Sequence, residues 1–244
     1  MESAKQELVD ARNRATYFPL KRLFDITLSF LGLMICSPVM LLIAAAIKAT
    51  SRGPAFYRGR RAGVCGKPFH MWKFRTMVLH ADSLGGSATP DDDPRITRFG
   101  YYLRKYKLDE IPQLWNVLKG EMSFVGPRPE IPEYIRSDDE REKVILGLRP
   151  GITDWASIWD CNEGSMLLGR ASPEHFYLES IRPVKVHLEY CYALRCSFWL
   201  DMKIIMYTLY RLLNRAWAPR EMAELLQGGA IPGSAHRRSK VDPL

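Results

Sequence analysis

The longest apolar stretch of the chain covers residues 30–47, and no residue within it carries a charge. Its length is about that of a helix that crosses a bilayer. Pro38 lies in the middle of the stretch and removes one backbone hydrogen bond, so we expect the helix to bend after Ser37. The Ser37 hydroxyl is placed to bond a carbonyl group that the proline frees, which would make the bend tolerable in lipid.

Basic residues flank this stretch on both sides. They are Arg12, Arg14, Lys21 and Arg22 before it, and Lys48, Arg52, Arg58, Arg60 and Arg61 after it. Because basic residues favour the cytoplasmic side of a membrane, both ends of the helix are assigned to that side. We therefore predict a re-entrant membrane helix over residues 20–49, broken at Ser37-Pro38 and preceded by an N-terminal extension over residues 1–19. A straight membrane anchor with a proline kink and a buried helix of a soluble protein are the alternatives.

Strand-like patterns follow the apolar stretch. Aromatic and apolar runs near residues 56–57 and 69–77 are separated by glycines and Pro68, which predicts a small β-hairpin. Lys73 and Arg75 alternate with aromatic residues, so both cations are expected on one side of a strand. That side is either a solvated face or part of a binding site.

Helical periodicity returns at residues 99–105 and again after Asp109. The sequence predicts Asp109 as the N-cap of the stretch "EIPQLWNVLK" and Gly120 as its end. Pro112 suits the first turn, because a missing N–H costs nothing there. The spacing predicts one buried face made of Ile111, Leu114, Trp115 and Leu118.

Two further helices are predicted in the last third of the chain. The first, "SPEHFYLESIRPVKVHLEYCYAL", has a break at Pro183, and the second is "SFWLDMKIIMYTLYRLLNRAW". Asp201 and Lys203 argue against a second membrane crossing, so the last helix either lies on the membrane surface or packs as a core helix. We predict a mainly helical α+β protein with a cytoplasmic catalytic domain over 50–226, membrane-surface helices and a disordered tail over 227–244.

Composition narrows the class of partner. The 244 residues are 47% hydrophobic, and the net charge of +8 favours an anionic partner such as nucleic acid, anionic lipid or a phosphorylated substrate. The five cysteines leave one unpaired in any disulfide scheme and show no zinc-ligand spacing, which favours a reducing compartment.

The candidate chemistry lies at Asp109 and Glu110. On local grounds the two carboxylates cap a helix and complement its dipole. The neighbouring cations Arg104, Lys107 and Arg128 exceed what a cap requires, and a helix start is also a natural phosphate site. Pro127 and Pro129 restrict the backbone around Arg128, which would hold its guanidinium in one direction, as contact with a phosphate requires.

Four ordered motifs resemble the bacterial sugar transferases that are monotopic phosphoglycosyl transferases. The motifs are "KRLFDITLSFLGLMICSPVMLLIAAAIK", "WKFRTM", "DPRITRFGYYLRKYKLDEIPQLWNVLKGEMSFVGPRPE" and "LRPGITDWASI". The resemblance is close over residues 21–158 and looser over the remainder.

The resemblance implies that the protein transfers a sugar-1-phosphate from a UDP-sugar to a polyprenol phosphate such as undecaprenyl phosphate, releasing UMP. Asp109 would attack the phosphorus atom and carry the phosphosugar covalently. Glu110 would help to hold Mg²⁺ or handle protons, and Asp109 and Glu110 together would be the metal ligands.

The resemblance also assigns the cations and the location. Arg104 and Arg128 match positions that contact phosphate or nucleotide, while Lys73, Arg75 and Arg149 match motif positions that are less securely tied to one role. Ser37-Pro38 matches the break of the family's re-entrant helix. The implied site is the cytoplasmic face of the bacterial inner membrane, among membrane lipids and without nucleic acid. The implied process is the first membrane step in making exopolysaccharide, lipopolysaccharide, capsule or another glycoconjugate.

The chain departs from the family pattern after Thr153, where it reads "DWASIWDCNEGSMLLG". This difference leaves the sugar open, and the sequence also leaves open whether the protein forms a homo-oligomer. The rival interpretation is a non-catalytic, membrane-tethered protein whose basic surface binds anionic lipid or nucleic acid.

Overall fold

The computed structural model describes residues 2–136, 138–160, 163–214 and 217–227, and the predicted tail over 227–244 lies almost wholly outside them. The strands are β1 (Phe56–Ala62), β2 (Pro68–Phe74), β3 (Ser123–Val125) and β4 (Gly151–Thr153). The helices are α1 (Glu2–Thr50), α2 (Ala81–Leu84), α3 (Arg98–Lys105), α4 (Gln113–Lys119), α5 (Glu140–Leu146), α6 (Trp155–Trp159), α7 (Glu163–Leu167), α8 (Pro173–Phe176), α9 (Arg182–Arg195), α10 (Phe198–Leu213) and α11 (Arg220–Gln227). The prediction of a mainly helical protein with a small sheet is confirmed.

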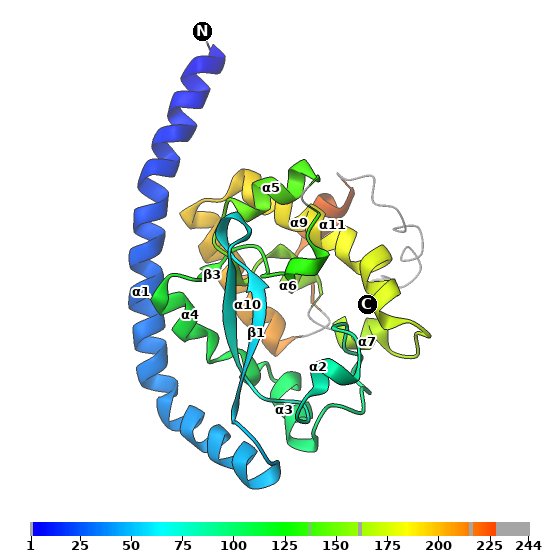
Figure 1. Ribbon diagram of the computed structural model, residues 1–244. Helices are drawn as coiled ribbons and strands as arrows, with labels where there is room; N and C mark the ends of the chain where they lie inside the picture. The colour runs from blue at the N-terminus through cyan, green and yellow to red at the C-terminus, as the bar shows by residue number, and fades with distance from the viewer. Residues whose placement is uncertain (1, 137, 161–162, 215–216, 228–244) are drawn as a thin grey trace.

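Helix α1 runs along one edge of the molecule and changes direction in its second half (Figure 1). Its section from Thr16 to Thr50 is long and apolar enough to cross a membrane by length and composition, and side chains such as Ile35 are 75% exposed. Pro38 lies within this section, and the Ser37 hydroxyl donates to the Met34 carbonyl, which has lost its partner to the proline. The predicted bond from Ser37 to a freed carbonyl is confirmed, and α1 remains helical through Pro38. The re-entrant path stays a prediction.

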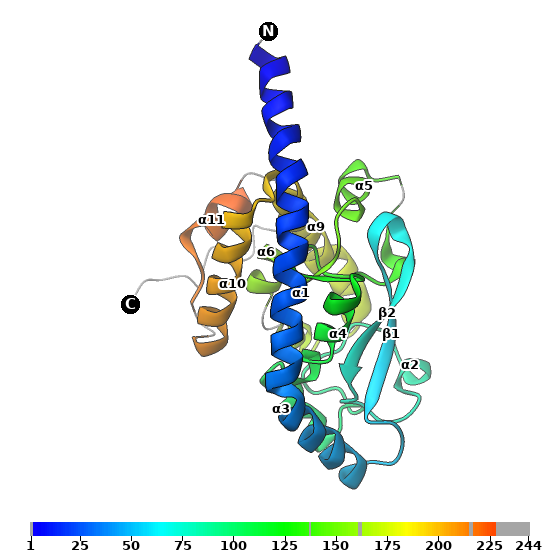
Figure 2. The same cartoon turned by 90° about the vertical axis from the view of Figure 1, so that its left-hand side faces the viewer.

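Buried polar bonds fasten the first half of α1 to the body. The Asp25 carboxylate accepts from the Ser123 hydroxyl and the Phe124 backbone N–H of β3. One turn earlier, Lys21 pairs with the buried Asp201 of α10 at 2.5 Å. Such bonds are strongly directional and costly to leave unmade, so they fix the position of α1 along its own axis relative to the rest of the protein. Figure 2 shows the result, with α1 lying between α10 on one side and the β1–β2 hairpin on the other.

The predicted hairpin is confirmed, and one amide side chain joins it to α4. Strands β1 and β2 pair antiparallel, with Phe56 opposite Phe74 and Ala62 opposite Pro68. The Asn116 side chain of α4 accepts from the Trp72 backbone N–H and donates to the His70 carbonyl at the edge of β2. A buried polar residue thus takes the place of a third strand.

This junction changes the face that α4 buries. Its most buried residues are Gln113, Asn116 and Val117, whereas Trp115 is 47% exposed. The prediction that Ile111, Leu114, Trp115 and Leu118 form the buried face is therefore wrong. The physical reason is that Asn116 must face the hairpin, which leaves Trp115 exposed and the other three residues only half-buried.

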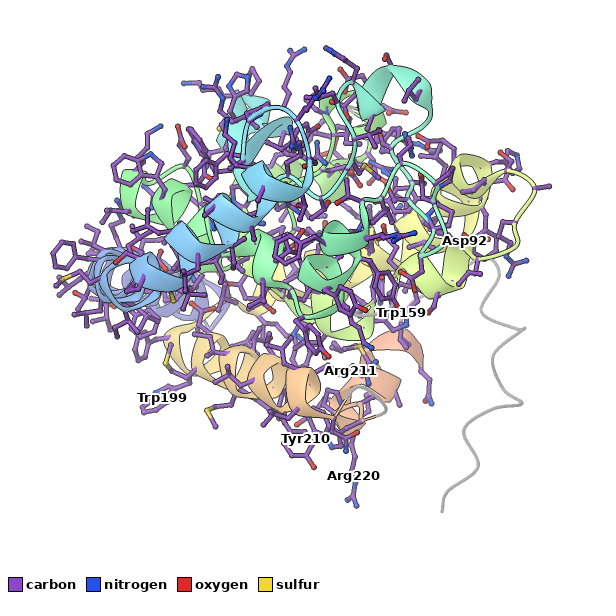
Figure 3. The ribbon with its side chains drawn as sticks, turned by 90° about the horizontal axis from the view of Figure 1, so that it is seen from below. Asp92, Trp159, Trp199, Tyr210, Arg211 and Arg220 are labelled. Carbon is purple, nitrogen blue, oxygen red and sulfur yellow. The ribbon has the colours of Figure 1, made fainter. Side chains whose placement is uncertain are left out.

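The main core lies among β3, α6, α9, α10 and α11. Its most buried members include Val125, Trp155, Leu188 and Ile204. Helix α10 contributes Ile204 and Asp201 to the interior, while Trp199 and Tyr210 project outward, 81% and 47% exposed (Figure 3). One side of α10 thus packs into the core, as a core helix does, and the other side exposes apolar groups, as a membrane-surface helix does.

The parallel pairing of β3 with β4 was not predicted. Ser123 pairs with Gly151 and Val125 with Thr153, just before the segment that Pro127 and Pro129 restrict. Strands of three residues lack the length from which alternation can be recognised.

Candidate functional site

Asp109 and Glu110 lie in a short 3₁₀ turn, η2 (Leu108–Glu110), between α3 and α4. Lys107 begins the turn with a left-handed backbone, φ 57°. The next helix starts only at Gln113, and Pro112 occupies its N-cap without a side-chain bond. The prediction that Asp109 caps this helix is therefore wrong, because the intervening turn carries it too far from the first free N–H groups.

Glu110 is the anion at the centre of a buried ion cluster. Its Oε1 atom accepts from Lys73 Nζ of β2 and from Arg128 Nη2, each at 2.8 Å. The Glu110 side chain is only 12% exposed. Burial raises the pKa of Glu110, but the Arg128 guanidinium and the Lys73 ammonium outweigh it and hold that pKa well below its ordinary value. Glu110 is thus an ionised group fixed in place by two cations.

Asp109 is held differently. The residue is 7% exposed, and its Oδ1 atom has no hydrogen-bond partner among the described residues. Burial raises the pKa of Asp109 above its ordinary value, and the Lys73 ammonium offsets only part of that rise. Lys107 and Arg104 also lower the pKa, which places their charges near this carboxylate. A desolvated carboxylate with a free oxygen has the properties of a nucleophile.

The Pro127-Arg128-Pro129 segment leaves the end of β3 and is fixed by the start of β4. The Gly151 N–H donates to the Pro127 carbonyl at 2.8 Å. A side chain on Gly126 could not fit, because its Cβ would lie 2.3 Å from the Arg149 carbonyl oxygen. Together with the two prolines, this close approach aims Arg128 at Glu110. The role of the prolines as rigid supports stays a prediction.

Behind Arg128 lies a second buried ion cluster, which the sequence did not predict. Lys185 of α9 bonds Asp160 at 2.7 Å and also bonds Glu163. Burial raises the pKa of Asp160 to about 7, although the Lys185 ammonium opposes the rise. The Glu110 carboxylate raises the pKa of Arg128 most, and Glu163 and Asp160 raise it further, so this cluster adjoins the first.

Glu189 supports the same loop from α9. This buried carboxyl accepts a hydrogen bond from the Arg128 backbone, and burial together with the nearby Asp154 raises its pKa well above the ordinary value. A small cavity next to the loop is lined by Arg128, Lys185 and Glu189 among others, but neither Asp109 nor Glu110 lines it. The signal for these residues was available in the sequence. Lys185 and Glu189 share a helical face with apolar neighbours, which is unusual unless the charges are paired.

The structure brings four of the predicted site residues together with Asp109: Glu110, Lys73, Arg128 and Arg104. Two others lie elsewhere. Arg149 is exposed and donates to the Gly120 carbonyl, at the far end of α4 from Asp109. Arg75 lies beside Ser51, at the end of α1. No group of three or more His, Cys, Asp or Glu residues able to hold a metal ion occurs in the described part of the chain.

Comparison with known proteins identifies relatives over most of the chain. A model of the family described as bacterial sugar transferase matches residues 16–215. A UDP-glucose:undecaprenyl-phosphate glucose-1-phosphate transferase of Xanthomonas campestris is 39% identical over 84% of this chain and 41% of its own length. A UDP-N-acetylgalactosamine-undecaprenyl-phosphate N-acetylgalactosaminephosphotransferase of Aeromonas hydrophila is 32% identical over 81% of this chain and 44% of its own.

The chain thus spans about two fifths of the length of these two relatives. It covers much more of EpsL of Bacillus subtilis, which is described as an uncharacterized sugar transferase. EpsL is 37% identical over 80% of this chain and 87% of its own length.

Proposed function

We propose that this chain, which belongs to the bacterial sugar transferase family, transfers a sugar-1-phosphate from a UDP-sugar to a polyprenol phosphate such as undecaprenyl phosphate and releases UMP. The observation that carries the proposal is the buried pair of carboxylates. Glu110 is fixed by Lys73 and Arg128, while Asp109 keeps an oxygen without a partner. The names of the relatives, which specify sugar-1-phosphate or sugar-phosphate transfer to undecaprenyl phosphate, support it.

The reaction has two displacement steps at one phosphorus atom. In the first step, a carboxylate oxygen of Asp109 attacks the phosphorus that bears the sugar, the P–O bond to UMP breaks, and UMP leaves with the electron pair. In the second step, an oxygen of the polyprenol phosphate attacks the same phosphorus, and Asp109 leaves as a carboxylate. Charge balances in both steps without the transfer of a proton, provided that Asp109 starts ionised.

This balance defines what the surrounding residues contribute. The cations Lys73, Arg128 and Arg104 stabilise the negative charge that moves from the attacking to the leaving oxygen. Glu110 holds two of these cations in position, and its own pKa, well below the ordinary value, makes it a poor proton carrier. We therefore assign Glu110 to positioning and to metal binding, and not to acid–base chemistry.

Mg²⁺ fits the donor set as a substrate-linked ion. Mg²⁺ is commonly held by one or two carboxylates together with substrate phosphates and water. Asp109 retains an unpartnered oxygen and would be one ligand, and Glu110 would be the other through the oxygen that binds neither cation. When bound, the ion would neutralise charge on the donor diphosphate.

The proposal includes a membrane location, which features of α1 support. Basic residues on both sides of the apolar stretch and the bend associated with Pro38 favour a re-entrant helix, with the domain on the cytoplasmic face of the inner membrane. A soluble nucleotide sugar and a lipid acceptor meet at that face. The product would serve as the first lipid-linked intermediate of an exopolysaccharide, lipopolysaccharide, capsule or related glycoconjugate.

The experiment is a donor panel with a covalent-intermediate readout. Purified protein is incubated with undecaprenyl phosphate, Mg²⁺ and UDP-glucose, UDP-galactose or their N-acetylamino counterparts, and UMP is measured. A donor labelled at the sugar-bearing phosphate should also label the protein when the acceptor is omitted. Asp109→Asn keeps the shape of the side chain but removes the nucleophile, so it should abolish both signals. Full activity in Asp109→Asn, or no UMP from any donor, would overturn the proposal.

A further inference from the structure

Arg75 lies beside the end of α1 and directly after β2, the strand that carries Lys73. It directly follows β2, and its backbone N–H donates to the Ala55 carbonyl at 2.9 Å, so it remains in register with the hairpin. Its guanidinium turns toward the segment after α1, where Nη2 donates to the Ser51 carbonyl and hydroxyl at 3.1 and 2.6 Å. The residue is 7% exposed.

The charge of Arg75 has no anion beside it in the described part of the chain. Its Nε and Nη1 atoms are buried and lack hydrogen-bond partners among the described residues, and its Nη2 atom donates to the neutral oxygens of Ser51. By contrast, Arg95, Arg128 and Arg182 each form an ion pair with a carboxylate. Burying an unpaired cation is costly, and a guanidinium with free N–H groups matches the oxygens of a phosphate.

Arg75 lies close in the chain both to residues that pack against the apolar end of α1 and to residues of the Asp109 site. Phe74, the residue before it, packs with Ile43 and Ile47 from the end of α1, and Leu108, the residue before Asp109, packs against the same cluster. Lys73, two residues earlier and therefore roughly 7 Å away along the strand, bonds Glu110. An amphiphile whose tail followed the apolar end of α1 would thus carry its head group to Arg75.

The backbone leaves room for this arrangement. Gly53 has φ +113°, and a Cβ there would lie 2.2 Å from Arg75 Nη1 and 2.6 Å from a methyl group of Leu79. A side chain at position 53 would push the guanidinium away. Leu79, which lies near the same point, is itself 43% exposed in the segment between β2 and α2.

We propose that Arg75 binds the phosphate group of the lipid acceptor and guides it toward the phosphosugar on Asp109. This inference rests on the proposed function and extends it to the acceptor subsite. The donor diphosphate carries the same chemistry, but Lys73, Arg128 and Arg104 already surround the place where it reacts. Arg75 instead lies at the end of the apolar helix, which favours a phosphate that is carried by a lipid.

The test separates the two half-reactions. Arg75→Gln and Arg75→Lys are compared with Arg60→Gln, which removes one positive charge from a side chain that is 63% exposed on β1. Labelling of the protein by the donor is measured without acceptor, and discharge of the label is then measured against undecaprenyl phosphate concentration. We expect Arg75→Gln to label within about twofold of the unmodified protein. Its half-saturating acceptor concentration should rise by about 10- to 100-fold, which is the loss of affinity expected when one hydrogen bond to a charged group is removed.

The conservative variant and the control sharpen the result. Arg75→Lys should recover part of the acceptor affinity because the charge is kept, and Arg60→Gln should behave as the unmodified protein. If Arg75→Gln loses donor labelling as much as discharge, the cation serves the donor or the fold, and the inference is refuted. Unchanged discharge in Arg75→Gln refutes it equally. Failure of the unmodified protein to take up label refutes the proposed function itself, which keeps the two failures distinguishable.

Discussion

Replacing Glu110 with glutamine tests whether the buried ion cluster holds the site together. The cluster contains the cations Lys73 and Arg128 and the carboxylates Glu110 and Asp109, so its charges cancel when both carboxylates are ionised. Glu110→Gln keeps an oxygen at this position but removes the negative charge that both cations share. Removal of one partner from a buried ion pair typically costs about 3–5 kcal/mol. For a chain of this size, that corresponds to a fall of roughly 6–20 °C in the melting midpoint.

A second substitution turns this estimate into a sharper test. Lys73→Met alone leaves Arg128 on Glu110, so it should cost less than Glu110→Gln. In the double variant, one cation and one carboxylate remain, and the charges cancel again. The double variant should therefore be more stable than the sum of the two single effects implies, by about 1–3 kcal/mol.

The assay is thermal unfolding of the four proteins in one detergent at one scan rate, followed by tryptophan fluorescence. Trp72 and Trp115 flank the cluster on β2 and α4, which makes the signal local as well as global. Strictly additive effects, or a Glu110→Gln midpoint equal to that of the unmodified protein, would show that Lys73 and Arg128 do not depend on Glu110 and would refute the reasoning.

Three further predictions concern the nucleophile, the docking of α1 and its path. Donor labelling should fall as the pH drops through a pKa above the ordinary aspartate value, because burial raises the pKa of Asp109 and only the ionised form attacks. Lys73→Met should move this fall to higher pH. A pH series of donor labelling without acceptor, run on both proteins, measures the two falls. Asp201→Asn should destabilise the protein by about 3–5 kcal/mol because Lys21 loses its buried anion, and addition of Lys21→Met should recover part of the melting midpoint. Pro38→Ala restores an N–H inside α1. Single cysteines placed before and after the apolar stretch should therefore label from one side of sealed vesicles in the protein with Pro38, and from opposite sides in the variant. Same-side labelling in both proteins would show that the proline does not set the path of the helix.

The elements that the sequence predicted well are those with a local cause. The hairpin is marked by alternating residues around Gly63 and Pro68, and the Ser37 bond follows from the missing N–H of Pro38. The errors around α4 have a non-local cause. Asn116 faces inward because the edge of β2 needs hydrogen-bond partners, and that edge is over 40 residues away in the chain.

The candidate site shows the same division. Asp109, Glu110 and Arg128 are recognisable from residue type and from the family motifs, but their pairing is not. Arg128 could have faced Asp109, Glu110 or the cluster at Lys185, and only the β3–β4 pairing selects Glu110. That pairing joins segments whose three residues each give no periodic signal, so no reading of the local sequence could have supplied it.

The structure also changes the source of the positive potential at Asp109. The sequence favoured the start of a helix as the phosphate site, but α4 has only seven residues and begins four positions after Asp109. A helix dipole is felt mainly within the first turn. Side-chain cations therefore remain as the main source, and they come from four segments: Lys73 from β2, Arg104 from α3, Lys107 from the start of η2 and Arg128 from the loop after β3. Because each is replaceable without breaking α4, their contributions to donor labelling can be measured one at a time, whereas a helix dipole could not be removed without removing the helix.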